Sequence, residues 1–131
     1  MKTILIELDK LKKHEAVNQN RVTKLKQQML FDGYIKNPVI VEKEHLIILD
    51  GHHRVQALLE LGAKYVPVQL VNYASDQVRV YWRSPNSTKE VKQAVIKMSL
   101  SGRVFGEKTT RHFIRKRLRQ VNINLKRLKL S

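Results

Sequence analysis

The residues best suited to chemistry lie in one short stretch, Asp50-Gly51-His52-His53-Arg54. An apolar run precedes it, and apolar residues recur with helical spacing after it as far as Gly62. This pattern predicts a buried strand, a tight turn and an amphipathic helix. Free N–H groups at a helix N-terminus attract anions, Gly51 allows close approach to the backbone, and Arg54 adds a planar cation. We therefore predict a phosphate-binding turn, although solvated side chains in a first helical turn explain the stretch equally well.

The helix that follows the turn leads into another predicted strand, which ends at Val71. Strand, helix and strand would form a βαβ-like unit, with the turn at the carboxyl end of a strand, where open α/β sheets usually bind ligands. The rest of the pattern predicts further strands, a helix from Arg21 to Asp32 capped by Asn20, and a helix that follows a capping box at Ser87–Glu90 and ends at Gly102. The further strands are expected at Thr3–Leu8, Val39–Val41, Leu46–Leu49, Val78–Trp82 and Val121–Leu125.

A second stretch with possible chemistry runs from Gly106 to His112. Thr110 could cap a short helix whose first turn carries Arg111 and His112. Such a group of donors and positive charge would hold a carboxylate or a phosphoryl group, with Arg111 binding it through two nitrogens. From local sequence alone, a basic helix start that faces solvent is an equally good interpretation.

Composition limits the classes of function. The chain has 131 residues, 42% of them hydrophobic, which fits one globular domain. It has no cysteine, so disulfides, thiolate metal sites and thiol catalysis are excluded. The N-terminus lacks an apolar signal core, and no apolar run approaches the roughly 20 residues that cross a bilayer. We therefore expect a cytoplasmic protein with no membrane partner.

The formal net charge is +15, and it is unevenly distributed. Residues 103–131, predicted to hold a short helix and a strand, carry ten lysines or arginines and one acid, Glu107. A basic C-terminal part of this kind suits nucleic acid, and it also suits other polyanions. The candidate nucleic-acid contacts are Arg115, Lys116, Arg117, Arg119, Lys126 and Arg127.

Leu49–Arg54, followed by Ala57-Leu58, Gly62 and Val66-Pro67-Val68, resembles the ParB/sulfiredoxin superfamily, whose members hold nucleotide phosphates with this turn. The sulfiredoxin branch requires a cysteine where this chain has His52. The DGHHR form, with Lys13-His14-Glu15 upstream and Lys108–His112 downstream, is most similar to the archaeal-type free L-serine kinases. The resemblance implies an α/β (α+β) single domain over residues 1–131, with a mixed sheet and flanking helices.

The similarity to the kinases implies a nucleotide-dependent phosphotransferase that forms O-phospho-L-serine from ATP or ADP, with Mg²⁺ expected. Glu15 matches the proposed catalytic base, and Asp50 would orient the acceptor hydroxyl or a magnesium ion. Taken without the family, Glu15 is more simply a surface acid. The phosphates would contact Gly51, His52, His53 and Arg54.

The substrate side of the implied pocket depends on residues far along the chain. Thr110, Arg111 and His112 would hold the carboxylate of serine or the phosphoryl group. Trp82 would line the amino-acid pocket, although a lone tryptophan is more simply a core or rim aromatic.

The alternative is a ParB-like protein that binds DNA or nucleotides, of the transcription or partition type or nuclease-like. The basic part at 103–131 would then contact phosphate backbones. Two departures favour this alternative: the free serine kinases are distinctly longer, and a metabolic kinase needs less positive charge. A nuclease, however, would need a metal-activated water and acids beyond Asp50 and Glu15. A third possibility is a structural or regulatory protein with an inactive site. The oligomeric state and the choice between ATP and ADP stay open.

Overall fold

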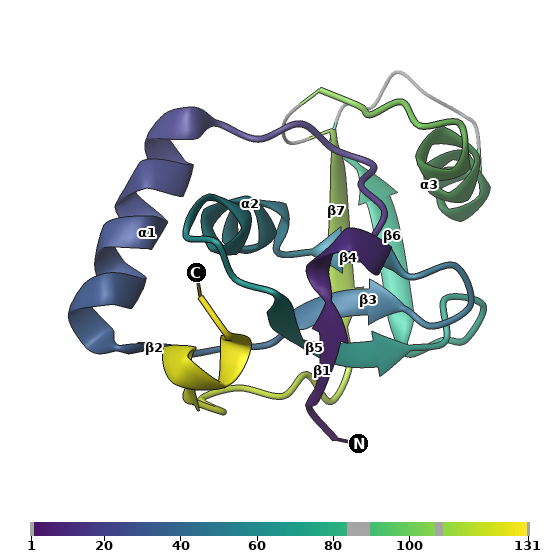
Figure 1. The fold of residues 1–131 in the computed structure, drawn as a ribbon. Coiled ribbons are helices and arrows are strands. Elements are labelled where there is room, and N and C mark those ends of the chain that lie inside the picture. Colours follow the sequence, from purple (N-terminus) through teal and green to yellow (C-terminus); the bar gives the residue numbers. More distant parts are fainter. Residues whose placement is uncertain (1, 84–89, 107–108, 131) are drawn as a thin grey trace.

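A four-stranded mixed sheet forms the centre of the molecule (Figure 1). Its strand order is β1 (Ile4–Glu7), β5 (Tyr65–Val71), β3 (Val39–Glu42) and β4 (Ile47–Asp50). Strand β5 is antiparallel to β1 and parallel to β3, and β3 is antiparallel to β4. The structure, a computed structural model, describes residues 2–83, 90–106 and 109–130.

The strands β3 and β4 confirm the predictions made from their apolar runs. Val39, Ile40 and Val41 are all fully buried, as expected for a strand that is covered on both faces. The expected βαβ-like unit was wrong in one respect: β4 and β5 are not neighbours, because β3 lies between them, and they run in opposite directions. The parallel pair is β3 and β5, so the turn at Gly51 follows an edge strand of the sheet.

Helix α1 (Gln19–Asp32) packs against helix α2 (His52–Glu60), and α2 lies between α1 and the sheet (Figure 1). Their buried residues join the strands in one apolar cluster, which includes Val22 and Leu58. Helix α1 begins two residues earlier than predicted, and its N-cap is Asn18, whose side chain accepts a hydrogen bond from the backbone N–H of Arg21 at 3.2 Å. Asn20 is already inside the first turn, so its predicted capping role was wrong.

A two-stranded antiparallel sheet, β6 (Val78–Trp82) and β7 (Thr110–Ile114), stands beside the central sheet, and helix α3 (Val91–Leu100) packs against β6. The short helix expected to start at Thr110 was wrong. This segment pairs along its whole length with β6, and its exposed residues alternate with more buried ones, which is the pattern of a strand. The predicted α3 is confirmed, with Glu90 as its N-cap; Ser87 of the predicted capping box lies outside the described residues.

The C-terminal part folds back onto the main domain. The strand predicted at Val121–Leu125 is limited to β8 (Ile123–Asn124), which pairs with β2 (Tyr34–Ile35). A 3-10 helix, η2 (Leu125–Leu128), follows and buries Leu128 completely in the main core. A further 3-10 helix, η1 (Leu8–Lys10), follows β1. None of the helices formed by the described residues is long and apolar enough to span a bilayer.

Candidate active site

The turn between β4 and α2 depends on Gly51. Its φ of +108° and ψ of 22° lie in the left-handed region, which disfavours residues with a Cβ. A Cβ at this position would lie 3.0 Å from Nη2 of Arg54 and 3.1 Å from a methyl group of Val39. Glycine therefore satisfies two requirements here, the backbone conformation and the close packing of the turn.

The segment that carries Glu15 is held between two parts of the fold. On one side, the N–H of Lys12 donates to the carbonyl of Leu46 at 2.9 Å, and the N–H of Ile48 donates to the carbonyl of Lys12 at 2.8 Å. On the other side, the N–H of Phe105 donates to the backbone carbonyl of His14 at 2.7 Å. The N–H of Ala16 donates to the backbone carbonyl of Phe105 at 2.8 Å. These backbone bonds fix Glu15 beside the carboxyl end of β4.

A cavity of about 410 Å³ collects most of the predicted site residues. It brings Glu15 to the same hollow as the Gly51 turn, together with residues of β7. It also contains four arginines from other elements that were not predicted for this pocket. The predicted residues that line it are Glu15, Asp50, Gly51, His52, His53, Thr110, Arg111 and His112, and the unpredicted arginines are Arg21, Arg83, Arg117 and Arg119.

Arg54 does not belong to this lining. Its Nη1 donates to the carbonyls of Asn37 and Pro38 at 2.9 and 3.0 Å, and its Nη2 lies 3.5 Å from Asp50 Oδ2. Burial lowers the pKa of Arg54, although Asp50 counteracts this effect. The side chain thus fixes the loop that precedes β3.

Trp82 also lies outside this lining. It lines a second hollow, of about 710 Å³, between α3 and the segment around Phe105. The indole packs edge-on against the Phe105 ring, with centroids 5.4 Å apart. The two hollows are nevertheless adjacent, because the backbone of Phe105 pairs with that of Glu15.

Two arginines of the basic C-terminal part, Arg117 and Arg119, reach the pocket because the chain around them is pinned to β5. The side chain of Gln69, fully buried, accepts from the N–H of Leu118 at 2.8 Å and donates to the carbonyl of Lys116 at 3.2 Å. Arg117 then forms an ion pair with Asp50. We predicted both arginines as possible nucleic-acid contacts; a buried glutamine in an apolar strand was the available signal that this segment is anchored.

The other predicted cations of the C-terminal part lie elsewhere. Arg115 borders a smaller hollow of about 190 Å³, next to the pocket and sharing Arg117 and Arg119 with it. Lys116, Lys126 and Arg127 are exposed and line neither hollow. The positive charge of residues 103–131 is therefore divided between the pocket and the outer surface.

The carboxylate of Glu15 is strongly stabilised in its charged form. Burial alone would raise its pKa, but the interactions with His14 and the hydroxyl of Thr110 lower the pKa to about 2. Thr110 Oγ1 donates to Glu15 Oε2 at 2.9 Å. Glu15 is therefore ionised throughout the neutral range.

Two histidines of the pocket accept hydrogen bonds at Nε2 from backbone N–H groups, so this nitrogen carries no hydrogen in either of them. The N–H of His14 donates to His52 at 3.2 Å, and the N–H of Asn18 donates to His53 at 3.0 Å. Nε2 of His112 shares a hydrogen bond of 2.9 Å with the hydroxyl of Tyr73. Burial and the nearby His14 keep the pKa of His52 well below its usual range and lower that of His112 to about 3. Positive charge in the pocket thus comes mainly from the arginines.

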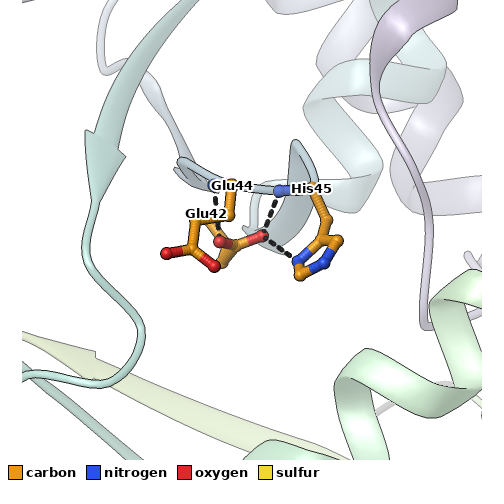
Figure 2. Close-up of side chains that lie close together, drawn as sticks. All are labelled: Glu42, Glu44 and His45. Atoms are coloured by element: carbon orange, nitrogen blue, oxygen red, sulfur yellow. Dashed lines mark hydrogen bonds and ion pairs between the residues drawn. The ribbon is translucent and has the colours of Figure 1, made fainter.

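A cluster of possible metal ligands lies outside the pocket, at the β3–β4 turn: Glu42, Glu44 and His45 (Figure 2). The two carboxylate oxygens of Glu42 accept the backbone N–H groups of Glu44 and His45 at 2.6 and 2.7 Å. These bonds are typical of a turn that is closed by a side chain, so His45 is a turn residue. Among the described residues no comparable group of three ligands gathers in the pocket itself.

The fold and the site define the class of protein: a mixed-sheet α/β domain of the ParB/sulfiredoxin-like fold, with an arginine-rich pocket at a strand–glycine–helix turn. The family model described as a putative ParB-like nuclease matches residues 2–96. The chain belongs to this ParB-like family.

Several curated relatives are named as kinases. The chain is 32% identical over 103 residues to the ADP-dependent L-serine kinase SerK of Thermococcus kodakarensis, an alignment that covers 76% of this chain and 43% of the relative. It is 33% identical over 81 residues to an ATP-dependent L-serine kinase of Staphylothermus marinus, covering 59% and 32%. The chain thus spans less than half the length of the curated relatives it matches.

Solved structures share the fold over nearly the whole chain. A free serine kinase in complex with AMP has a TM-score of 0.82 at 19% identity, over 96% of this chain and 93% of that one. C-terminally truncated SbnI from Staphylococcus aureus has a TM-score of 0.82 at 17% identity, over 97% and 89%. The expected fold class is confirmed.

Proposed function

We propose that this protein is a nucleotide-dependent phosphotransferase that forms O-phospho-L-serine from free L-serine. The observation that carries the proposal is that Glu15 and the Gly51 turn, 36 positions apart in the sequence, line the same cavity. The relatives that are named L-serine kinases support the assignment of the acceptor.

The phosphates of the donor, ATP or ADP, would lie at the first turn of α2. The N-terminus of a helix presents backbone N–H groups and a positive dipole end to an anion. Five arginines and two acids line the cavity, an excess of positive charge that suits an oligophosphate. Arg117 and Arg119 would neutralise charge on the transferred group, in place of Arg54, which the sequence predicted to contact the phosphates.

Serine would bind between Glu15 and β7. Its carboxylate would pair with Arg111 beside His112, and its hydroxyl would donate a hydrogen bond to Glu15. In the reaction, serine Oγ forms a bond to the terminal phosphorus, the bond from phosphorus to the nucleotide oxygen breaks, and the hydroxyl proton passes to Glu15. A carboxylate with a low pKa suffices as acceptor because phosphoryl transfer proceeds through a loose transition state that needs little early deprotonation.

A magnesium ion would be coordinated mainly by phosphate oxygens and water. Asp50 is the pocket carboxylate best placed to contribute, since it adjoins the turn, but it is already paired with Arg117 and Arg54. When bound, the ion would neutralise charge on the phosphates. Trp82 would contribute to the amino-acid pocket only from the adjacent hollow, which it lines together with Phe105.

The test is an assay for O-phosphoserine with serine and either ATP or ADP as donor. Glu15→Gln should lower turnover by roughly 10²- to 10⁴-fold with folding intact, whereas the matched change Glu44→Gln, at the β3–β4 turn, should have no effect. Absence of phosphoserine with either donor, from protein that binds nucleotide, would reject the kinase. Duplex DNA binding that falls by about 0.9 log units per log unit of salt for each phosphate contact, and survives Glu15→Gln, would support the DNA-binding alternative instead.

A further inference from the structure

The imidazole of His14 is completely buried beneath the pocket. His14 is part of the Lys13-His14-Glu15 motif, but the sequence indicated no role for it. Its Nδ1 lies 2.7 Å from the carbonyl oxygen of Ile48 on β4. Its Nε2 lies 3.2 Å from Thr110 Oγ1 on β7 and 3.6 Å from Glu15 Oε2. One ring therefore contacts the central sheet, the two-stranded sheet and the acid of the proposed reaction.

The hydrogen atoms available to these groups determine the protonation of the ring. The carbonyl of Ile48 can only accept, so Nδ1 of His14 carries a hydrogen. Glu15, ionised, can also only accept, and it lies 2.9 Å from Thr110 Oγ1. The single hydroxyl hydrogen of Thr110 is therefore directed to Glu15. The Thr110 oxygen must then accept from His14, which requires a hydrogen on Nε2 as well.

A neutral His14 does not satisfy the same contacts. The Thr110 hydroxyl would have to turn toward Nε2, and its oxygen would then face the Glu15 carboxylate at 2.9 Å with no hydrogen between them. An unsatisfied contact of this kind is costly in a buried site. The low pKa of Glu15 depends in part on this same interaction with His14, so the ionised carboxylate and the charged ring occur together.

We propose that His14 is held as an imidazolium and is the built-in counter-ion of Glu15, a positioning residue that acts through the Thr110 hydroxyl. The other groups that face the ring do not provide this charge. The ring of His52 on α2 and that of His112 on β7 lie 4.5 and 5.4 Å away between centroids, and burial lowers the pKa of both. Lys92 and Arg117 contribute to lowering the pKa of His112.

The consequence for catalysis rests on the proposed function. A donor oligophosphate brings several negative charges close to Glu15, and these by themselves would raise its pKa and protonate it. A positive charge fixed beneath the carboxylate opposes this shift. It keeps Glu15 ionised and oriented toward the serine hydroxyl while the phosphates are bound.

The first experiment measures protonation by NMR and does not depend on enzymatic activity. Protein labelled with ¹⁵N-histidine should show at neutral pH one ring with both nitrogens protonated, and His14→Asn should remove that signal; the rings of His52 and His112 should each show one unprotonated nitrogen. A ¹³C-carboxyl titration should show the pKa of Glu15 rising by about one unit or more in His14→Asn. A His14 ring with an unprotonated Nε2, or an unchanged Glu15 titration, would overturn the proposal.

The second experiment uses phosphoserine formation. An asparagine at position 14 can still donate to Ile48 but carries no charge, so kcat should fall about tenfold or more while the KM for nucleotide changes little. The acid limb of the kcat profile should move to higher pH. His45→Asn, at the β3–β4 turn, is the matched control.

A substitution of His14 could also prevent folding, so Thr110 offers an independent comparison. Thr110→Val removes the hydroxyl at nearly constant shape and should reproduce the change in the Glu15 titration. Thr110→Ser retains the hydroxyl and should preserve the wild-type titration. Equal titrations in the two variants would contradict a role for the hydroxyl. If the wild type forms no phosphoserine, the proposed function fails while both titrations still test the ion pair.

Discussion

The turn at Gly51 and the strand β7 adjoin the same cavity, but the molecule supports them in different ways. The turn joins an edge strand of the four-stranded sheet to α2, and Val39, which packs against the turn, is completely buried. Strand β7 has a single partner, β6, in a two-stranded sheet, an arrangement that is marginally stable without further packing. The family match, residues 2–96, contains the turn and ends before β7 begins.

This difference separates two kinds of binding surface. The turn contributes mainly backbone groups, whose positions are determined by the sheet and the helix. The region after residue 96 contributes side chains, Thr110, Arg111, His112, Arg117 and Arg119, whose positions depend on contacts with distant parts of the chain. We infer that the turn provides the general capacity to hold phosphate and that the later segment provides selectivity for the second substrate.

The largest effect is expected from changing the turn itself. Gly51→Ala should lower the free energy of unfolding by about 2–5 kcal/mol, because it adds a left-handed alanine and a close contact with Val39. Gly33→Ala is the matched control, since Gly33 also has a positive φ, +79°, but a Cβ there would meet nothing within 4 Å. Urea unfolding and nucleotide titration would test both variants. Equal losses of unfolding free energy in Gly51→Ala and Gly33→Ala would show that close packing at the Gly51 turn is unimportant.

The second prediction divides the basic C-terminal part. Arg117→Ala should weaken ADP binding by roughly 10- to 100-fold, since a charge-assisted hydrogen bond contributes about 1.5–3 kcal/mol. Arg127→Ala removes the same charge from an exposed position outside the pocket and should change affinity by less than about twofold. Calorimetric titration would measure both. Similar losses in the two variants would mean that general charge, and not the pocket, binds the nucleotide.

The third prediction concerns the stability of the β7 side in acid. His112 has a pKa of about 3 in the folded protein against an ordinary value of 6.5. Between these values the unfolded chain binds a proton that the folded chain does not, so this contribution to stability is complete above pH 6.5 and is lost as the pH falls toward 3. His112→Gln should reduce the pH dependence of the free energy of unfolding by up to about 1.4 kcal/mol per pH unit.

Urea unfolding between pH 7 and pH 5 would isolate this contribution, because carboxylates titrate mostly below that interval. His52, whose pKa is also lowered by burial, should contribute in the same direction and remain in the variant. His45→Asn, at a partly exposed turn, serves as the control. A pH dependence that is identical in the wild type and His112→Gln would contradict the assigned burial of His112.

The smallest effect is expected at the start of α1, where Asn18 caps the helix and its backbone N–H donates to His53. Asn18→Ala removes the N-cap and should cost about 1 kcal/mol, whereas Asn20→Ala should cost less than about 0.5 kcal/mol. Thermal or urea unfolding of the two variants would distinguish the observed cap from the predicted one. A larger loss for Asn20→Ala would place the start of the helix where the sequence pattern suggested.

Local patterns were sufficient for elements whose stability comes from neighbouring residues. The apolar runs at β3 and β4, the glycine turn and α2 were all predicted from residues within a few positions of one another. The start of α1 was misplaced by two residues because Asn18 and Asn20 are equally good caps in isolation. The segment at Thr110 was mistaken for a helix because its threonine suits a cap, whereas its pairing partner, β6, lies about 30 positions earlier.

The amino-acid sequence by itself determined the strand, the glycine turn and the helix around residues 47–60, because these elements depend on residues that are adjacent in the chain. Only the tertiary structure decided which distant side chains lie beside that turn and beside Glu15. Arg117 reaches the pocket through Gln69, and His14 meets Thr110 across 96 positions of sequence. Contacts of this kind depend on strand register and burial, and residues close in sequence carry no information about them.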